Sequence, residues 1–118
     1  MKSYTDIEQS KKLAKILPLE SADMFHFIHN DNHSETIGFG YDKVAAEFYS
    51  KTKLEYIPCW SLAALFNVLP QIGGIKPVLD LETNCIQYPS DIDLSITADN
   101  SVDACYEMIL KLHELKML

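Results

Sequence analysis

Three histidines, His26, His29 and His33, stand close together in the chain, with Asp31 between the last two. On a helix, this spacing would bring imidazole rings to one face, where they could hold a zinc ion. The surrounding segment MFHFIH (24–29) is rich in aromatic residues, however, and predicts a strand. His26 and His29 would then point to opposite sides of that strand. We therefore expect solvated or half-buried histidines here rather than a metal site.

Cys59 is a candidate nucleophile because it follows Pro58 at the start of a predicted helix. Backbone N–H groups at such a position lower the pKa of a thiol. A catalytic cysteine also needs a base, and His26, His29, His33 or His113 could supply one. No oxyanion loop, strained elbow or acid–base pair accompanies Cys59 in the sequence, so the favoured interpretation is a packed thiol. The alternative is a small hydrolase or transferase that uses Cys59 with a histidine.

The other two cysteines, Cys85 and Cys105, stand far from Cys59, and the chain contains no CxxC pair. An odd number of separated thiols predicts neither a structural zinc site nor a closed set of disulfides. Gly73-Gly74 lacks the frame of a phosphate-binding loop and does not open a helix. We expect no cofactor.

Acidic residues are concentrated in one part of the chain. The net charge is −7, and residues 77–110 contain acids but no base. Asp91-Ile92-Asp93 resembles the DxD motif of metal-dependent enzymes, but the glycine turn and distal glutamate of a calcium loop are absent. A solvated strand face is the plain interpretation. The functional hypothesis is that Asp80, Glu82, Asp91 and Asp93 form an outer sheet face that binds a cationic partner.

Composition excludes several classes of function. The chain has ten Lys, seventeen Asp and Glu, and no Arg. It therefore lacks the planar guanidinium group that makes paired hydrogen bonds to phosphates and to guanine edges. Direct binding to nucleic acid or to an anionic membrane is therefore not expected. No stretch approaches the roughly 20 apolar residues of a membrane-spanning helix. The start, MKSYTDIEQSKK, lacks the apolar centre of a signal peptide, which predicts a cytoplasmic protein.

Helices and strands alternate in a pattern that can position these groups. Thr5 and Glu8 have the spacing of a capping box and predict a helix over 6–17, which Pro18 ends. The segment 42–57 has no clear assignment and could form a short helix or an extended arm. A final helix begins at Asn100 or Ser101, and its apolar stripe includes Val102, Cys105 and Met108. The remaining expected elements are a hairpin of 24–29 with 36–41, a helix over 60–69, a hairpin of 77–81 with 85–88, and a strand over 92–98.

The resulting order is α-β-β-(x)-α-β-β-β-α, in which short antiparallel connections dominate. It predicts a single two-layer α+β domain over residues 1–118, with one antiparallel sheet and about three helices packed mainly on one face. The helix 60–69 is apolar nearly all round, so it must be buried on several sides or covered by a partner. A homodimer would supply such a cover.

Three segments carry a resemblance to known sequences: PCWSLAALFNVLP (58–70), DNSVDACYEMILKLHEL (99–115) and TDIEQSKKLAKILPLESADM near the start. Together they resemble small uncharacterised proteins of Bacteroides genomes that are associated with phage or other mobile elements. The resemblance implies a genomic context and no activity, cofactor or site residue.

Together these observations favour a non-enzymatic accessory protein that binds another protein through an acidic or apolar face. The cysteine-dependent enzyme described above is one alternative. A second is an acidic mimic of nucleic acid, which would require the acids of 77–110 to form a continuous stripe on the surface.

Overall fold

The computed structural model describes residues 2–29, 31–89 and 91–118, and for residues 91–93 it describes the backbone alone. The α+β class predicted from the sequence is confirmed. The elements are α1 (Ile7–Leu13), a short 3-10 helix (Leu19–Ser21), β1 (Met24–His29), β2 (Ser34–Phe39), α2 (Lys43–Tyr49), β3 (Leu54–Cys59), α3 (Leu62–Val68), β4 (Val78–Asp80), β5 (Cys85–Tyr88), β6 (Asp91–Thr97) and α4 (Ser101–Glu114).

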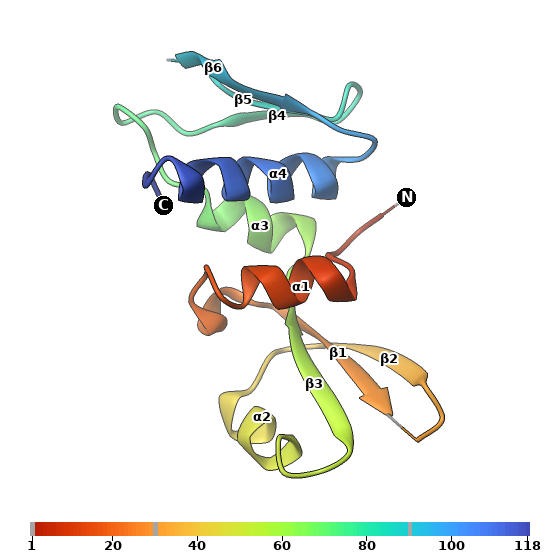
Figure 1. Ribbon diagram of the computed structural model, residues 1–118. Coiled ribbons are helices and arrows are strands. Elements are labelled where there is room, and N and C mark those ends of the chain that lie inside the picture. The colour runs from red at the N-terminus through yellow and green to blue at the C-terminus, as the bar shows by residue number, and fades with distance from the viewer. Residues whose placement is uncertain (1, 30, 90) are drawn as a thin grey trace.

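The strands form two antiparallel sheets, where one had been expected. An N-terminal sheet has the order β2-β1-β3, and a C-terminal sheet has the order β4-β5-β6. Helices α1, α3 and α4 lie between the two sheets, so the layers are stacked along the long axis of a 47 × 27 × 21 Å molecule (Figure 1). The helices therefore do not cover one face of a single sheet.

The segment 42–57, for which the sequence left two options open, contains both a helix and an extended arm. Asp42 caps α2, because its side chain accepts a hydrogen bond from the backbone N–H of Val44. The chain then returns as β3, which pairs with β1 in the register Met24↔Cys59. This pairing completes the N-terminal sheet, with β1 at its centre.

The capping box of α1 lies one residue later than predicted. Asp6 accepts from the backbone N–H of Gln9, and the Gln9 side chain accepts from the backbone N–H of Asp6. Thr5 is fully buried instead, and its Oγ1 lies 2.7 Å from Ser10 Oγ and accepts from the Trp60 backbone N–H. A buried backbone donor needs a partner, and Thr5 provides it. The regular helix also ends at Leu13 rather than at 17.

The main core fills the space between α1, α3, α4 and the C-terminal sheet. Trp60, Leu65, Ile86 and Leu112 are all fully buried there. The predicted apolar stripe of α4 is buried as far as Leu112. None of the described helices is long and apolar enough to cross a membrane.

A polar network holds the N-terminus against α4. Lys2 Nζ donates to Asp103 Oδ1 at 2.8 Å, and Gln9 donates to the same oxygen at 2.9 Å. Burial alone would raise the pKa of Asp103, but hydrogen bonds from Lys2, Gln9 and Asn100 outweigh it and lower that pKa. Asp103 is thus a structural residue at the start of α4.

Candidate functional site

Cys59 lies at the end of β3 and is fully buried. Its thiol donates to the Thr5 carbonyl oxygen at 3.4 Å and accepts from Thr5 Oγ1 at 3.6 Å. Burial raises the pKa of the Cys59 thiol, which keeps it protonated and unreactive at neutral pH. This is the environment of a packed thiol.

His26 lies near Cys59 but is not arranged as its base. Its Nε2 lies 2.8 Å from the carbonyl oxygen of Thr5. A carbonyl oxygen has no proton to give, so Nε2 must carry the hydrogen and cannot take a proton from a thiol. Among the described residues, no histidine is hydrogen-bonded to Cys59. The geometry therefore argues against the cysteine-dependent enzyme.

Thiol labelling tests this environment directly. In the native protein, a thiol reagent should react with one cysteine, the half-buried Cys85, because Cys59 and Cys105 are both fully enclosed. Burial also raises the pKa of Cys105 to about 11. The Cys85→Ser variant should show no rapid labelling until it is unfolded in denaturant. Rapid modification of Cys59 in that folded variant would restore the nucleophile hypothesis.

The three clustered histidines do not converge. Burial alternates along β1, so His26 faces the core while His29 lies on the opposite face, as the strand pattern predicted. His33 is exposed in the turn after β1, at a φ of 56°. In the part of the chain that the structure describes, no three His, Cys, Asp or Glu side chains are grouped to hold a metal ion.

Asp80 and Glu82 occupy the turn between β4 and β5. Asp80 ends β4, and its side chain accepts from the backbone N–H groups of Glu82 and Thr83 at 2.9 and 3.4 Å. Such an Asx turn is a structural reason for the carboxylate. Glu82 lies beyond the end of the strand, in the turn and not on the sheet face. The side chains of Asp91 and Asp93 lie outside the described residues.

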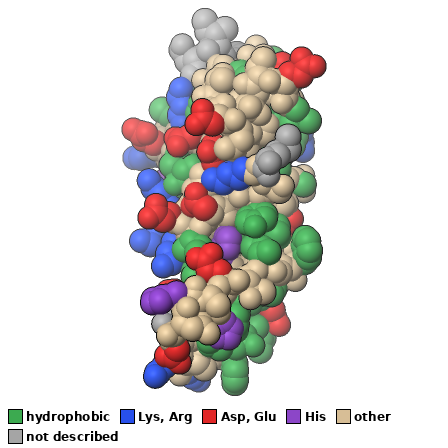
Figure 2. All heavy atoms as spheres, turned by 90° about the vertical axis from the view of Figure 1, so that its right-hand side faces the viewer, with side chains coloured by type: hydrophobic (Ala, Val, Ile, Leu, Met, Phe, Trp, Pro, Cys, Tyr) green, Lys and Arg blue, Asp and Glu red, His purple; other side chains and the backbone are tan. Residues whose placement is uncertain are grey.

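The other acids of 77–110 are also placed apart. Asp99 precedes α4, Asp103 pairs with Lys2, and Glu107 is exposed on α4 itself. Figure 2 shows the side of the molecule on which α4 begins, and acidic groups there have lysines among them. This mixture gives no support to the mimic of nucleic acid.

The most exposed strand is β2, which forms an edge of the N-terminal sheet. It pairs with β1, and no described strand pairs with its outer side. Ile37 and Phe39 lie opposite His26 and Met24, whose side chains face the core. α1 packs mainly on β3, and Phe39 is 86% exposed. Natural edge strands usually carry protection against pairing, and β2 contains neither lysine nor proline.

A pocket of about 330 Å³ lies beside this strand, between β2 and the start of α1. We call it the α1–β2 pocket. Two carboxylates belong to its wall: Asp6, which is ion-paired with Lys2 at 3.2 Å, and Glu35, which forms no ion pair with any described residue. Glu35 is therefore the carboxylate of this pocket that is open to a cation. The lining residues of the pocket are Tyr4, Asp6, Ile7, His26, Glu35, Thr36 and Ile37.

The opposite face of the N-terminal sheet is aromatic and is covered by α2. Phe25, Phe27 and Tyr56 pack together there, with Phe25 and Tyr56 ring centroids 4.8 Å apart. Gly38 lies directly opposite Phe25, and a Cβ at Gly38 would come within 2.3 Å of the Phe25 ring. The Phe25 ring therefore occupies the space that a side chain at position 38 would need, and a larger residue there would displace the ring.

A larger open groove of about 710 Å³ lies between α3 and β4. We call it the α3–β4 groove. Its wall is almost wholly apolar, and it includes Val78 and Leu81, which are 51% and 64% exposed. Its lining residues are Leu62, Ala63, Phe66, Pro77, Val78, Leu79 and Leu81. The sequence had indicated surplus apolar surface on this helix.

In comparisons with known proteins, no family model, no curated protein and no solved structure matches the chain. The sequence predicted a strand over 36–41 beside 24–29, which β2 (Ser34–Phe39) confirms with its bounds moved by two residues, but it predicted neither the exposure of this strand nor the α1–β2 pocket. Only the length of α1 and its position on β3 reveal that this face is uncovered.

Proposed function

We propose that the protein is a non-enzymatic interaction protein that binds an extended segment of another protein along the outer edge of β2. The observation that carries this proposal is the open edge itself. Alternate residues of this six-residue strand present backbone donors and acceptors on that side without a described strand partner, and a nearly fully exposed aromatic side chain, Phe39, lies at its end. An added strand would satisfy these groups and cover the apolar side chains.

The α1–β2 pocket indicates which partner side chain would fit. In strand addition, main-chain hydrogen bonds provide affinity, and pockets beside the strand select alternate side chains of the partner. Glu35, which has no described ion-pair partner, belongs to the wall of this pocket, and the whole chain carries a net charge of −7. We therefore infer that the partner segment carries a lysine or arginine that enters the pocket. Partners encoded next to the gene are the first to examine, given the resemblance to proteins of mobile elements.

The experiment is a selection of peptides from a random display library against the full chain. The enriched peptides should combine β-branched or aromatic residues with a Lys or Arg at a fixed position. Their affinity should fall by about tenfold or more in Phe39→Ala, since exposed aromatic anchors dominate such interfaces. Glu35→Lys should weaken binding comparably, because it places a like charge beside the incoming cation.

Two control variants share the same chemical changes but lie on α2. Phe48→Ala removes an exposed aromatic ring, and Glu47→Lys reverses an exposed charge. Both should bind the selected peptides as the unaltered chain does. An equal loss of peptide affinity in the α2 variants would contradict the proposal. So would selected peptides that bind Phe39→Ala and Glu35→Lys as tightly as the unaltered chain.

A further inference from the structure

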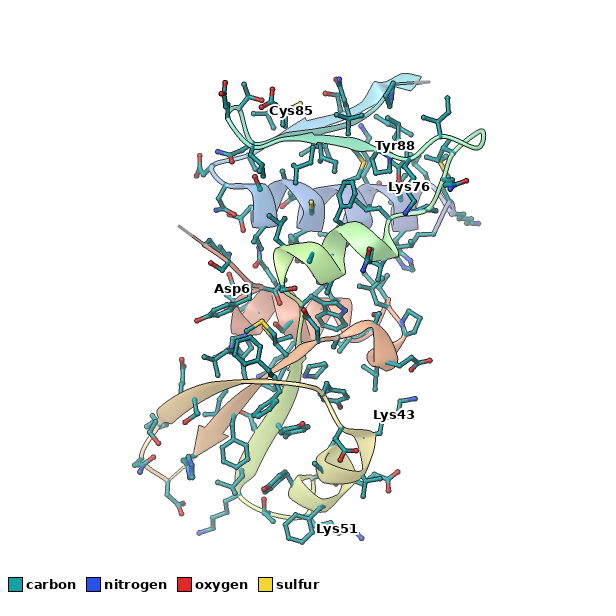
Figure 3. All side chains as sticks on the ribbon, turned by 180° about the vertical axis from the view of Figure 1, so that it is seen from behind. Asp6, Lys43, Lys51, Lys76, Cys85 and Tyr88 are labelled. Carbon is teal, nitrogen blue, oxygen red and sulfur yellow. The ribbon has the colours of Figure 1, made fainter. Side chains whose placement is uncertain are left out.

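The C-terminal sheet has an open edge of its own, which is independent of the proposed function at β2. β4 pairs with β5, and its other side has no described strand partner. This side opens on the α3–β4 groove, whose exposed apolar residues include Val78 and Leu81. Figure 3 shows this sheet from behind, with Lys76 near one end and Cys85, which follows the β4–β5 turn, near the other.

We propose that a second copy of the chain docks on this edge, with β4 of one protomer pairing antiparallel with β4 of its partner about Leu79. A twofold arrangement of this kind places each residue opposite a defined residue of the other copy. Leu79 then lies opposite Leu79, and Val78 lies opposite Asp80. The two sheets become one six-stranded sheet, and the two α3–β4 grooves close against each other.

The charges along this edge suit that register. Lys76 and Glu82 flank the two ends of β4, so an antiparallel arrangement about Leu79 brings Lys76 of each copy toward Glu82 of the other. Lys76 is the only base between Lys53 and Lys111 in the sequence, and it forms no ion pair with any described residue. Glu82 is likewise exposed and unpaired in the described structure. The arrangement allows two ion pairs at the ends of the paired strands and places no like charges opposite each other along β4.

The length of β4 argues for a copy of the chain over a foreign strand. β4 has three residues, and Pro77 before it has no backbone N–H to donate. Few main-chain hydrogen bonds can form along so short an edge, so burial of the apolar groove must supply most of the affinity. A twofold contact buries two such grooves at once, whereas a single added strand would cover only one.

A charge-reversal series tests this register. Sedimentation or light scattering of the full chain should show a monomer–dimer equilibrium. Lys76→Glu and Glu82→Lys should each raise the dimer dissociation constant by about tenfold or more, because like charges then face each other. The double variant Lys76→Glu/Glu82→Lys should restore dimerisation, since each pair is rebuilt with its charges exchanged. Lys51→Glu and Glu47→Lys make the same charge changes on or next to α2 and should leave the equilibrium unchanged.

Several outcomes would overturn the inference. A monomer at every concentration would show that the groove serves another occupant or none. A dimer that is insensitive to the single reversals would lie at another surface, and one that the double variant fails to restore would have another register. The peptide selection reports on β2 alone, so either proposal can fail without the other.

Discussion

Replacing Trp60 with alanine is expected to lower the free energy of unfolding by about 3–5 kcal/mol, which is among the largest effects of a single substitution in this chain. Trp60 is fully buried between β3 and α3, and its indole N–H donates to Ser21 Oγ at 2.9 Å. Removing the ring leaves a cavity at the place where the N-terminal segment, the 3-10 helix and α3 meet. The total stability of a small domain is about 5–15 kcal/mol, so the variant should lose a large share of its stability.

Urea unfolding followed by far-ultraviolet circular dichroism measures this loss without relying on the fluorescence of the tryptophan that is removed. Phe48→Ala is the control: it removes an aromatic ring that is 65% exposed, so its effect should stay within about 0.5 kcal/mol. A loss below 1 kcal/mol in Trp60→Ala would mean that the ring is not packed as described.

Thr5→Val should lower the free energy of unfolding by about 2–6 kcal/mol, although valine and threonine have nearly the same shape. The hydroxyl of Thr5 accepts from the Trp60 backbone N–H at 3.2 Å and lies 2.7 Å from Ser10 Oγ. All three groups are buried away from water, and each polar group left without a partner costs about 1–3 kcal/mol. The expected loss is the sum of two such costs.

Thr5→Ser separates this cause from ordinary packing. Serine keeps the hydroxyl and loses only a methyl group, so it should retain most of the stability that valine loses. The same denaturant series compares the two variants. If Thr5→Ser were as destabilised as Thr5→Val, the methyl group and not the hydrogen bonds would account for the role of Thr5.

Local patterns predicted the local structure well. The aromatic alternation of 24–29 predicted a strand with His26 and His29 on opposite faces, and Pro77 to Tyr88 predicted a hairpin that turns near Asn84, where φ is 55°. Gly73 and Gly74, which the sequence favours as the end of the preceding helix and the start of a turn toward Pro77, both have positive φ between the paired Ile72 and Ile75. Each of these features depends on neighbouring residues alone.

Pairing between distant segments accounts for what the sequence did not predict. β3 joins β1 through Tyr56 and Cys59, residues that carry no local sign of their partner strand. Thr5 fits the pattern of a helix cap, but it is used instead to satisfy the distant backbone of Trp60. The exposure of β2 depends on where α1 ends and which strand it covers. Such facts are set by tertiary packing.

Hydrogen exchange in the presence of a selected peptide tests the central claim, binding along β2, most directly. In the free protein, amide hydrogens on the outer side of Ser34–Phe39 should exchange rapidly, because they are open to water. Saturating peptide should slow these amides by at least about tenfold, while amides of α2 and of the α3–β4 groove keep their rates. Binding that leaves the exchange of Ser34–Phe39 unchanged, or that protects another surface instead, would contradict the account.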